Sequence, residues 1–209
     1  GLTEASPIVT SSNGLEQRIG SVGKVLEGMQ VRLVDEHGDD ALQGDAGEIW
    51  VKGPNVFMGY LDEPEATAKV LTADGWLRTG DIGFFDADGY LFITGRLKEM
   101  INRGGEKLAP REVDETLLAH PMVRQAVAFA VPHPSLGEDV VAAVVLHPGA
   151  DCTEADLRGF VLDRLPAFKA PSRIIVVPDI PRGSTGKIQR IGLARQLGAF
   201  LATAYEEPA

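Results

Sequence analysis

Hydrophobic and polar positions in the first half of the chain follow the two-residue period of β-strands or form short apolar runs. This pattern predicts strands at residues 29–34, 48–52, 81–85 and 90–94. Residues 35–38 (DEHG) and 86–89 (DADG) have the composition of turns between these strands. Residues 63–71 have a helical period instead, with Pro64 in the first turn. We therefore expect the first part of the chain to form a small antiparallel sheet or barrel.

After residue 98 the pattern becomes a mixture of helices and strands. Helical periods cover residues 110–119, 153–165 and 191–204, and apolar β-branched runs predict strands at 123–131, 140–147 and 173–178. Thr153 and Asp156 have the three-residue spacing of a capping box at the start of the second helix. The expected fold is α/β overall, with a small antiparallel β-rich part followed by a compact α+β domain.

The net charge of the chain is −10 and is unevenly distributed. Residues 1–97 contain 7 Lys and Arg against 16 Asp and Glu, whereas residues 98–209 contain 13 against 14. Because this change coincides with the change in secondary-structure pattern, we predict a domain boundary at residues 96–98. An acidic chain of this kind is not expected to bind nucleic acid nonspecifically.

Length and composition narrow the class of protein further. A chain of 209 residues with 44% hydrophobic and 24% charged residues is sufficient for one or two globular domains. Its apolar runs are shorter than the roughly 18 residues that a membrane span needs. The single cysteine, Cys152, cannot form an intramolecular disulfide, which favours a reducing, cytoplasmic location. Because the sequence begins at Gly1 rather than Met, we expect it to be a fragment.

Two segments of the first part combine residue types that are suited to nucleotide binding. In residues 1–4 (GLTE), Thr3 offers a hydroxyl for a phosphate oxygen and Glu4 offers a carboxylate for a divalent cation. In residues 78–81 (RTGD), Asp81 follows a glycine where a strand begins, and a carboxylate there can accept both hydroxyls of a ribose. Taken alone, the GLTE segment is no evidence for a site, and a Thr-Gly-Asp sequence is more often simply a turn.

The double glycine at residues 104–105 follows a cationic segment at residues 95–98 (GRLK). Two glycines permit backbone conformations and a close approach of ligand that a Cβ atom would block. The alternative interpretation is the tip of a tight hairpin.

A loop at residues 181–187 (PRGSTGK) presents Lys187 among glycine and hydroxyl residues. It is not a P-loop, because Pro181 stands where that motif requires glycine and Ile188 stands where it requires Ser or Thr. A lysine on a glycine-containing loop is nevertheless suited to stabilising a transient oxyanion.

Other reactive residue types are not expected to form a site. The four histidines have no metal-ligand spacing, so we predict no zinc site. Cys152 has no evident partner base and is not expected to be a nucleophile. Trp50 and Trp76 are expected to pack against neighbouring side chains rather than stack on adenine.

Five segments in this order resemble the C-terminal part of the adenylate-forming superfamily, which includes acyl- and aryl-CoA synthetases, peptide-synthetase adenylation domains and firefly-type luciferases. They are GLTE (1–4), GEIWVKGPNVFMGYLDEPEAT (47–67), RTGD (78–81), GRLKEMINRGGEKLAPREVD (95–114) and PRGSTGKIQR (181–190). Within the superfamily, INRGGEKLAPREVDE (101–115) and VRQAVAFAVPHPSLGED (123–139) are similar to AMP-forming acyl-CoA synthetases of the oxalate-CoA ligase-like and bacterial groups.

The resemblance implies a two-step acid–thiol ligase reaction that uses ATP, Mg²⁺ and coenzyme A. A carboxylic acid attacks the α-phosphorus of ATP, and the thiol of CoA then displaces AMP from the acyl-adenylate. The resemblance also implies that residues 1–97 are the β-rich end of an AMP-binding domain and that residues 98–209 are its mobile C-terminal domain, with a hinge at 96–98. The rest of the N-terminal domain would precede Gly1, so we expect this chain alone to be inactive.

The family's functional residues can be carried over to matching positions of this sequence. Thr3 would contact the phosphate of AMP, and Glu4 would bind Mg²⁺. Asp81 would accept the ribose hydroxyls, and Arg96 would assist at the ribose or phosphates. Lys187 would bridge the attacking carboxylate and the α-phosphate.

The second half-reaction implies a different set of residues. Lys98 falls at the hinge position, where rotation of the C-terminal domain would exchange Lys187 for the Gly104-Gly105 segment. This segment would line the path of the pantetheine arm, while Lys107 and Arg103 are weaker candidates for contacts with CoA or adenylate.

Two alternative functions stay open at this stage. The enzyme could load its acyl group onto the phosphopantetheine of a carrier protein, or the chain could be a noncatalytic fragment or interaction module. A homodimer is also left open. The expected partners are a small carboxylic acid and CoA, with no nucleic acid and no membrane span, and the sequence does not identify the acid.

Overall fold

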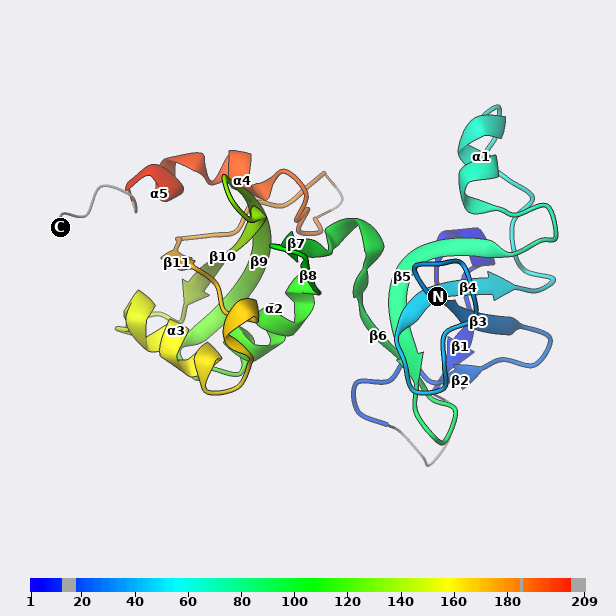
Figure 1. Ribbon diagram of the computed structural model, residues 1–209, viewed down its shortest axis with the longest axis horizontal. Coiled ribbons are helices and arrows are strands. Elements are labelled where there is room, and N and C mark those ends of the chain that lie inside the picture. Colours follow the sequence, from blue (N-terminus) through cyan, green and yellow to red (C-terminus); the bar gives the residue numbers. More distant parts are fainter. Residues whose placement is uncertain (13–17, 185, 204–209) are drawn as a thin grey trace. The chain divides into compact units, whose positions relative to one another are not determined.

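The computed structural model describes residues 1–12, 18–184 and 186–203, and the chain divides into two compact units. Unit 1 is Gly1–Lys98 and unit 2 is Glu99–Ala209. Figure 1 shows the strands and helices of each unit, and the two are described separately. Among the described residues, no helix is both long and apolar enough to cross a membrane.

Unit 1 is built on a four-stranded antiparallel sheet in the order β3-β4-β5-β6. Its strands are β3 (Gln30–Val34), β4 (Gly47–Lys52), β5 (Leu77–Phe85) and β6 (Leu91–Arg96). A short antiparallel pair, β1 (Thr10–Ser11) and β2 (Lys24–Val25), accompanies the sheet, and the helical turns are η1 (Thr3–Ala5) and α1 (Pro64–Val70). This arrangement confirms the predicted antiparallel, β-rich first part.

The strand period of β4 determines which side chains form the core of unit 1. Ile49 and Val51 are buried and contact Leu77, Leu91 and Val9 in one hydrophobic cluster. Trp50 points to the other face, where the Arg32 guanidinium lies 4.6 Å from its ring. The indole therefore packs against a cation of its own sheet, as expected for a packing residue.

Unit 2 contains a mixed sheet in the order β11-β10-β7-β8, with β9 also paired to β10. The strands are β7 (Ile101–Arg103), β8 (Glu106–Leu108), β9 (Val123–His133), β10 (Gly137–Leu146) and β11 (Arg173–Val176), of which β11 runs parallel to β10. The helical elements are η2 (Leu97–Glu99), which spans the boundary between the units, α2 (Pro110–Leu118), α3 (Glu154–Leu162), η3 (Ala167–Lys169), α4 (Leu193–Gln196) and α5 (Gly198–Thr203). The mixed α/β class that the sequence predicts is confirmed.

Strand β10 is buried on both faces, so successive residues enter different hydrophobic clusters. Val140, Ala142 and Val144 pack with residues of α2 and α3, whereas Val141, Ala143 and Val145 pack with Leu193 of α4. In Figure 1, α2 and α3 accordingly lie on one side of β9 and β10, with α4 on the other. This explains the near-continuous apolar run in the sequence.

Three details of the sequence prediction are corrected by the structure. The strand predicted at residues 81–85 begins at Leu77, so Asp81 lies within β5 and not at its start. The helix predicted at residues 191–204 is two short helices, α4 and α5, because Leu197 leaves the helical conformation and Gly198 follows it; residue 204 lies outside the described residues. The three-residue strands β7 and β8 were not predicted, since so few residues give no measurable period. The predicted capping box at Thr153 is present.

Candidate active site

The GLTE segment forms a single helical turn whose backbone is held by unit 1. Ala5 is completely buried, and the amide of Phe57 donates to the carbonyl oxygen of Glu4 at 2.8 Å. The side chain of Thr3 is exposed, and that of Glu4 is half-buried. The backbone is therefore fixed while the hydroxyl and the carboxylate stay accessible.

Tyr60 is a functional candidate that the sequence analysis missed. Its hydroxyl donates to Oε1 of Glu4 at 2.9 Å, and its ring packs edge-on against Phe57 with centroids 4.9 Å apart. The hydrogen bond to the Glu4 carboxylate raises the pKa of Tyr60, so the phenol stays protonated and able to donate. The only signal in the sequence was its position inside the GYLDEPEAT block.

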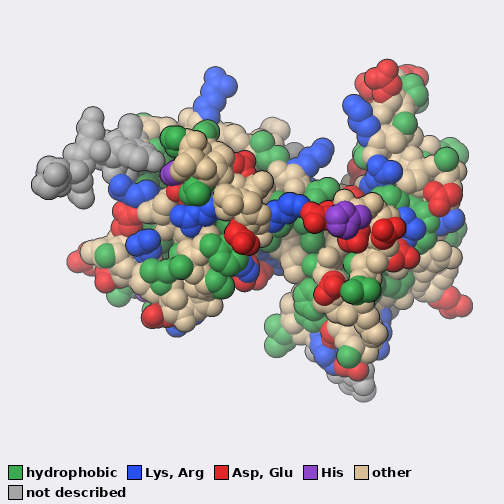
Figure 2. All heavy atoms as spheres, in the orientation of Figure 1, with side chains coloured by type: hydrophobic (Ala, Val, Ile, Leu, Met, Phe, Trp, Pro, Cys, Tyr) green, Lys and Arg blue, Asp and Glu red, His purple; other side chains and the backbone are tan. Residues whose placement is uncertain are grey.

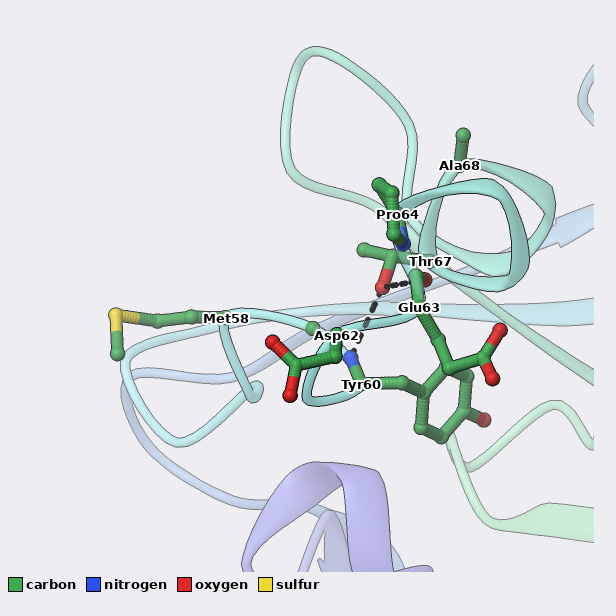
Figure 3. Close-up of a pocket in the computed structure, with 8 residues that line it drawn as sticks. Met58, Tyr60, Asp62, Glu63, Pro64, Thr67 and Ala68 are labelled. Carbon is green, nitrogen blue, oxygen red and sulfur yellow. Dashed lines mark hydrogen bonds between the residues drawn. The ribbon is translucent and has the colours of Figure 1, made fainter.

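The loop that carries Tyr60 is shaped by Thr67. The Tyr60 amide donates to Oγ1 of Thr67 at 2.9 Å, and this hydroxyl donates to the carbonyl oxygen of Glu63 at 2.9 Å. Figure 3 shows both bonds beside a shallow pocket of about 410 Å³. Gly59 has a φ of +143°, and a Cβ there would come within 2.9 Å of the Thr67 side chain. The loop geometry therefore requires glycine at this position.

Asp81 and Arg96, both predicted to bind nucleotide, are brought together by the sheet. They face each other across β5 and β6, and Nε of Arg96 lies 3.1 Å from Oδ1 of Asp81. Glu48 accepts the Gly80 amide at 3.0 Å, and the hydroxyl of Thr79 accepts the Asp81 amide at 3.1 Å. Neighbouring strands thus fix the backbone that presents the carboxylate.

One small pocket connects Asp81 with the GLTE segment. Asp81, Thr79, Gly1 and Leu2 all line it, together with hydrophobic residues of the core. Within unit 1, therefore, the structure places Gly1 and Leu2, the start of the segment predicted to bind phosphate and a cation, beside the predicted ribose-binding carboxylate.

In unit 2, Gly104 and Gly105 form the two-residue turn of the β7–β8 hairpin. Both have positive φ, +63° and +99°, and Arg103 pairs with Glu106 on either side of them. A Cβ at Gly104 would come within 3.0 Å of Leu136, whereas a Cβ at Gly105 would have no described atom within 4 Å apart from those of its chain neighbours. The hairpin-tip interpretation therefore describes the local structure, and the role in a pantetheine path stays a prediction.

The other predicted residues near this hairpin differ in exposure. Arg103 lies 2.8 Å from Asp139 and donates to the carbonyl oxygens of Phe168 and Ala170 at 2.9 and 3.0 Å. Lys107 and Lys98 are exposed. Lys98 is the last residue of unit 1 and belongs to the η2 turn.

The loop that carries Lys187 is a narrow turn closed by its own backbone. Arg182 and Ile188 form an isolated β-bridge, and the Gly183 amide donates to the carbonyl oxygen of Lys187 at 2.9 Å. Gly186 has a φ of +75°, and residue 185 lies outside the described residues. The Lys187 side chain is exposed at this turn. The ammonium group of Lys187 is therefore accessible to an external anion.

The described residues contain no group of three or more His, Cys, Asp or Glu side chains that could hold a metal ion by themselves. A lone carboxylate such as Glu4 still fits Mg²⁺, because this ion is commonly held by one or two carboxylates together with phosphates of the substrate.

On the face of each unit that Figure 2 shows, surface charge alone does not mark the site. Figure 2 shows acidic and basic side chains interspersed over the visible face of both units. The candidate site is therefore defined by individual residues, such as Asp81 and Arg96, and not by a patch of one charge.

Comparison with known proteins identifies the family to which the chain is related. The family model described as AMP-binding enzyme matches residues 1–61, and the model of the AMP-binding enzyme C-terminal domain matches residues 112–187. The chain is 45% identical over 197 residues to a sulfoacetate–CoA ligase of Cupriavidus necator and 44% identical over 192 residues to an oxalate–CoA ligase of Arabidopsis thaliana. The chain belongs to the adenylate-forming acyl-CoA synthetase family. These matches cover 92% and 90% of the chain but 38% and 37% of the relatives, so the chain spans under two-fifths of their length.

Several solved structures have the same fold as this chain. An ATP-bound structure of MatB from Rhodopseudomonas palustris matches 94% of the chain and 39% of its own length, with a TM-score of 0.88 and 38% identity. A MenE o-succinylbenzoate CoA synthetase from Bacillus subtilis in complex with AMP matches 91% of the chain and 39% of its own length, with a TM-score of 0.81 and 30% identity. An amide bond synthetase, McbA from Marinactinospora thermotolerans, matches 85% of the chain and 36% of its own length, with a TM-score of 0.80 and 39% identity.

Proposed function

We propose that this chain is the C-terminal portion of an enzyme that activates a carboxylic acid with ATP and transfers the acyl group to CoA. The observation that carries the proposal is the Asp81–Arg96 pair beside the pocket that Gly1 and Leu2 also line. The relatives support this reading, because the sulfoacetate and oxalate enzymes are CoA ligases. By the complete enzyme we mean this chain joined to the N-terminal portion that its relatives carry.

In the first step, a carboxylate oxygen of the acid forms a bond to the α-phosphorus of ATP. The bond from this phosphorus to the bridging oxygen breaks, and pyrophosphate leaves with the bonding electrons. Asp81 accepts the ribose hydroxyls, and Thr3 donates to an α-phosphate oxygen. Lys187 offsets the negative charge on the attacking carboxylate and the α-phosphate, as a preorganised cation does for phosphoryl transfer.

We assign Glu4 as the residue that would hold Mg²⁺ beside the phosphates. When bound, the ion would neutralise the charge that develops on the pyrophosphate. Tyr60 orients the Glu4 carboxylate through its hydroxyl.

In the second step, the sulfur of CoA attacks the carbonyl carbon of the acyl-adenylate. The bond from this carbon to the phosphate oxygen breaks, AMP leaves, and the thiol proton passes to solvent. For this step we propose a rotation about Lys98 that replaces Lys187 by the Gly104-Gly105 turn. Among the described residues, and apart from the chain neighbours of Gly105, no atom lies within 4 Å of a Cβ position there, which supports an open approach for the pantetheine arm.

The acid substrate is not specified by these residues, and the acceptor belongs to the proposal. One of the similar structures is described as an amide bond synthetase, so we include an amine among the acceptors to be tested. We propose CoA because the two curated relatives described above are CoA ligases. We place the enzyme in the cytoplasm because the only cysteine of this chain is Cys152, which cannot form a disulfide within the chain.

The test is a parallel assay of acceptors with the complete enzyme. A panel of small carboxylic acids, including oxalate and sulfoacetate, is incubated with ATP, Mg²⁺ and either CoA, a carrier protein or an amine. We expect AMP, pyrophosphate and a CoA thioester in equal amounts for at least one acid. Thioester on the carrier protein alone, or amide alone, would overturn the choice of acceptor. ADP as the nucleotide product would overturn the adenylation mechanism.

A further inference from the structure

Arg190 lies three residues after Lys187 and is almost buried, with 14% of its side chain exposed. Its Nη2 donates to Oδ2 of Asp114 at 2.8 Å, and its Nε donates to Oε2 of Glu99 at 3.0 Å. Its Nη1 donates to the carbonyl oxygen of Ala128 and to Oδ1 of Asp114. One guanidinium therefore binds two carboxylates and a strand carbonyl.

The partners of Arg190 come from three separate parts of unit 2. Asp114 lies on α2, Ala128 lies in the centre of β9, and Glu99 is the residue directly after Lys98. The Asp114 carboxylate also accepts the amide of Ala128, so helix, strand and guanidinium form one network. Burial raises the pKa of Asp114, while Arg190 opposes this effect by its charge and hydrogen bonds.

We propose that Arg190 is a positioning residue for Lys187: it fixes the base of the lysine loop to the sheet and to Glu99. This inference rests on the proposed function of Lys187. It explains how a lysine on a loop with Gly183 and Gly186 can act as a preorganised cation. The arrangement also makes the lysine move together with the first residue beyond the proposed hinge.

The loop that carries Lys187 is held by contacts of different strength. The Gly183–Lys187 hydrogen bond closes the turn internally but does not orient it relative to the sheet. Arg182 contacts Gln125 at 3.1 Å in an exposed position, where a hydrogen bond competes with water. The Arg190 contacts are shielded from solvent, and breaking one partner of such a network leaves an uncompensated buried charge. Of the two arginines, Arg190 therefore makes the stronger orienting contact, beside the packing of Ile188 against the hydrophobic cluster that contains Val141.

The first experiment measures both half-reactions of the complete enzyme with Arg190→Gln. We expect adenylation to lose at least tenfold in kcat, with the KM for ATP within threefold of the wild type. Thioester formation from supplied acyl-adenylate should stay within threefold. The matched control is Arg173→Gln, which breaks another Arg–Glu pair of unit 2, to Glu154 at 3.1 Å, away from the loop. The control should leave both steps within twofold.

A double variant tests whether Arg190 acts through Lys187. In a Lys187→Ala enzyme, Arg190→Gln should cause no further loss of adenylation. A further loss in this background, or an equal loss in both half-reactions of the single variant, would assign Arg190 a merely structural role and overturn the proposal. If Arg190→Gln does not fold, Glu99→Gln replaces it, because that variant retains the Asp114 pair. We then expect a threefold or larger loss confined to adenylation.

Hydrogen exchange in the 209-residue chain separates this proposal from the proposed function. We expect Arg190→Gln to speed exchange of the Gly183 amide at least tenfold, whereas Arg173→Gln leaves it unchanged. Unchanged exchange in Arg190→Gln would overturn the positioning role whatever the enzyme catalyses. Failure of the wild-type complete enzyme to form an acyl-adenylate would overturn the function instead.

Discussion

The hydroxyl of Tyr60 donates a 2.9 Å hydrogen bond to the carboxylate of Glu4, 56 positions earlier in the chain. The Phe57 amide holds the backbone of the same glutamate. Two contacts from one loop thus fix both the main chain and the side chain of the residue that we assign to Mg²⁺.

Tyr60→Phe should weaken binding of ATP in the presence of Mg²⁺ by roughly fivefold, because the net value of such a hydrogen bond is about 1 kcal/mol. Binding of ATP in the presence of EDTA should not change. Calorimetric titration of the complete enzyme measures both affinities. Met58→Ala, which alters a fully exposed side chain of the same loop, is the control. Equal affinities for the wild type and Tyr60→Phe with Mg²⁺ would contradict the orienting role.

Asp81→Ala should weaken ATP binding by roughly 10- to 100-fold, since hydrogen bonds to a charged group contribute about 1.5–3 kcal/mol. Both half-reactions should slow, because both use the nucleotide. The variant should also lose the wild-type preference for ATP over 2′-deoxy-ATP in a competition assay. Unchanged kinetics in both steps would show that the ribose assignment is wrong.

Lys187→Ala should reduce adenylation by about a hundredfold or more, the scale for loss of one preorganised oxyanion donor. Transfer to CoA from a synthetic acyl-adenylate should survive, because we assign Lys187 no contact in that step. Single-turnover assays of each half-reaction measure this. Arg182→Gln, a neighbouring exposed cation, should have a much smaller effect. A small, equal decrease in both steps of Lys187→Ala would end the catalytic assignment.

Lys98→Pro should restrict rotation at the proposed hinge, because proline fixes φ near −65° and removes a backbone donor. In an enzyme held in the adenylating arrangement, thioester formation should fall much more than adenylation. Comparing the two half-reactions of the variant measures this difference. An equal loss would indicate misfolding, and no loss would place the pivot elsewhere.

Thr153→Ala should lower the free energy of unfolding by about 1 kcal/mol at pH 7, the usual cost of losing an N-cap. The hydrogen bonds from Thr153 lower the pKa of Asp156 in the folded protein. Their contribution to the free energy of unfolding is therefore complete above the ordinary pKa of an aspartate. It is lost as the pH falls through the lower pKa of the folded state. The difference between wild type and variant should therefore shrink below about pH 4. Urea unfolding of the chain at several pH values measures it.

Thr116→Ala is the matched control for this prediction. The hydroxyl of Thr116 donates to the backbone carbonyl oxygen of Glu112 within α2, and this hydrogen bond involves no carboxylate. Its effect on unfolding should not vary with pH. A Thr153→Ala difference that stays constant between pH 3 and 7 would contradict the link to Asp156.

Local features of the fold could be predicted from the sequence, because their physical cause lies within a few residues. The Thr153 capping box and the Pro110 helix start are of this kind. The Asp81–Arg96 contact is different, since it depends on which strands become neighbours. The roles of Tyr60 and Arg190 could not be predicted either, because their partners Glu4 and Asp114 lie 56 and 76 positions away in the sequence. The periodicity of hydrophobic residues within one element does not predict contacts between distant residues, which form only when each unit packs.

Strand β10 has a consequence for how such enzymes can be recombined. Its alternating residues belong to two hydrophobic clusters, and Ile188, next to Lys187, packs against the second of them. If part of unit 2 came from a homologous enzyme, the residues of one hydrophobic cluster would be replaced while β10 kept its own side chains. Side chains on that face of β10 would then pack against neighbours to which they are not fitted. Grafts should therefore retain function when joined at Lys98–Glu99, and a crossover inside β10 should produce a protein that unfolds early or does not fold.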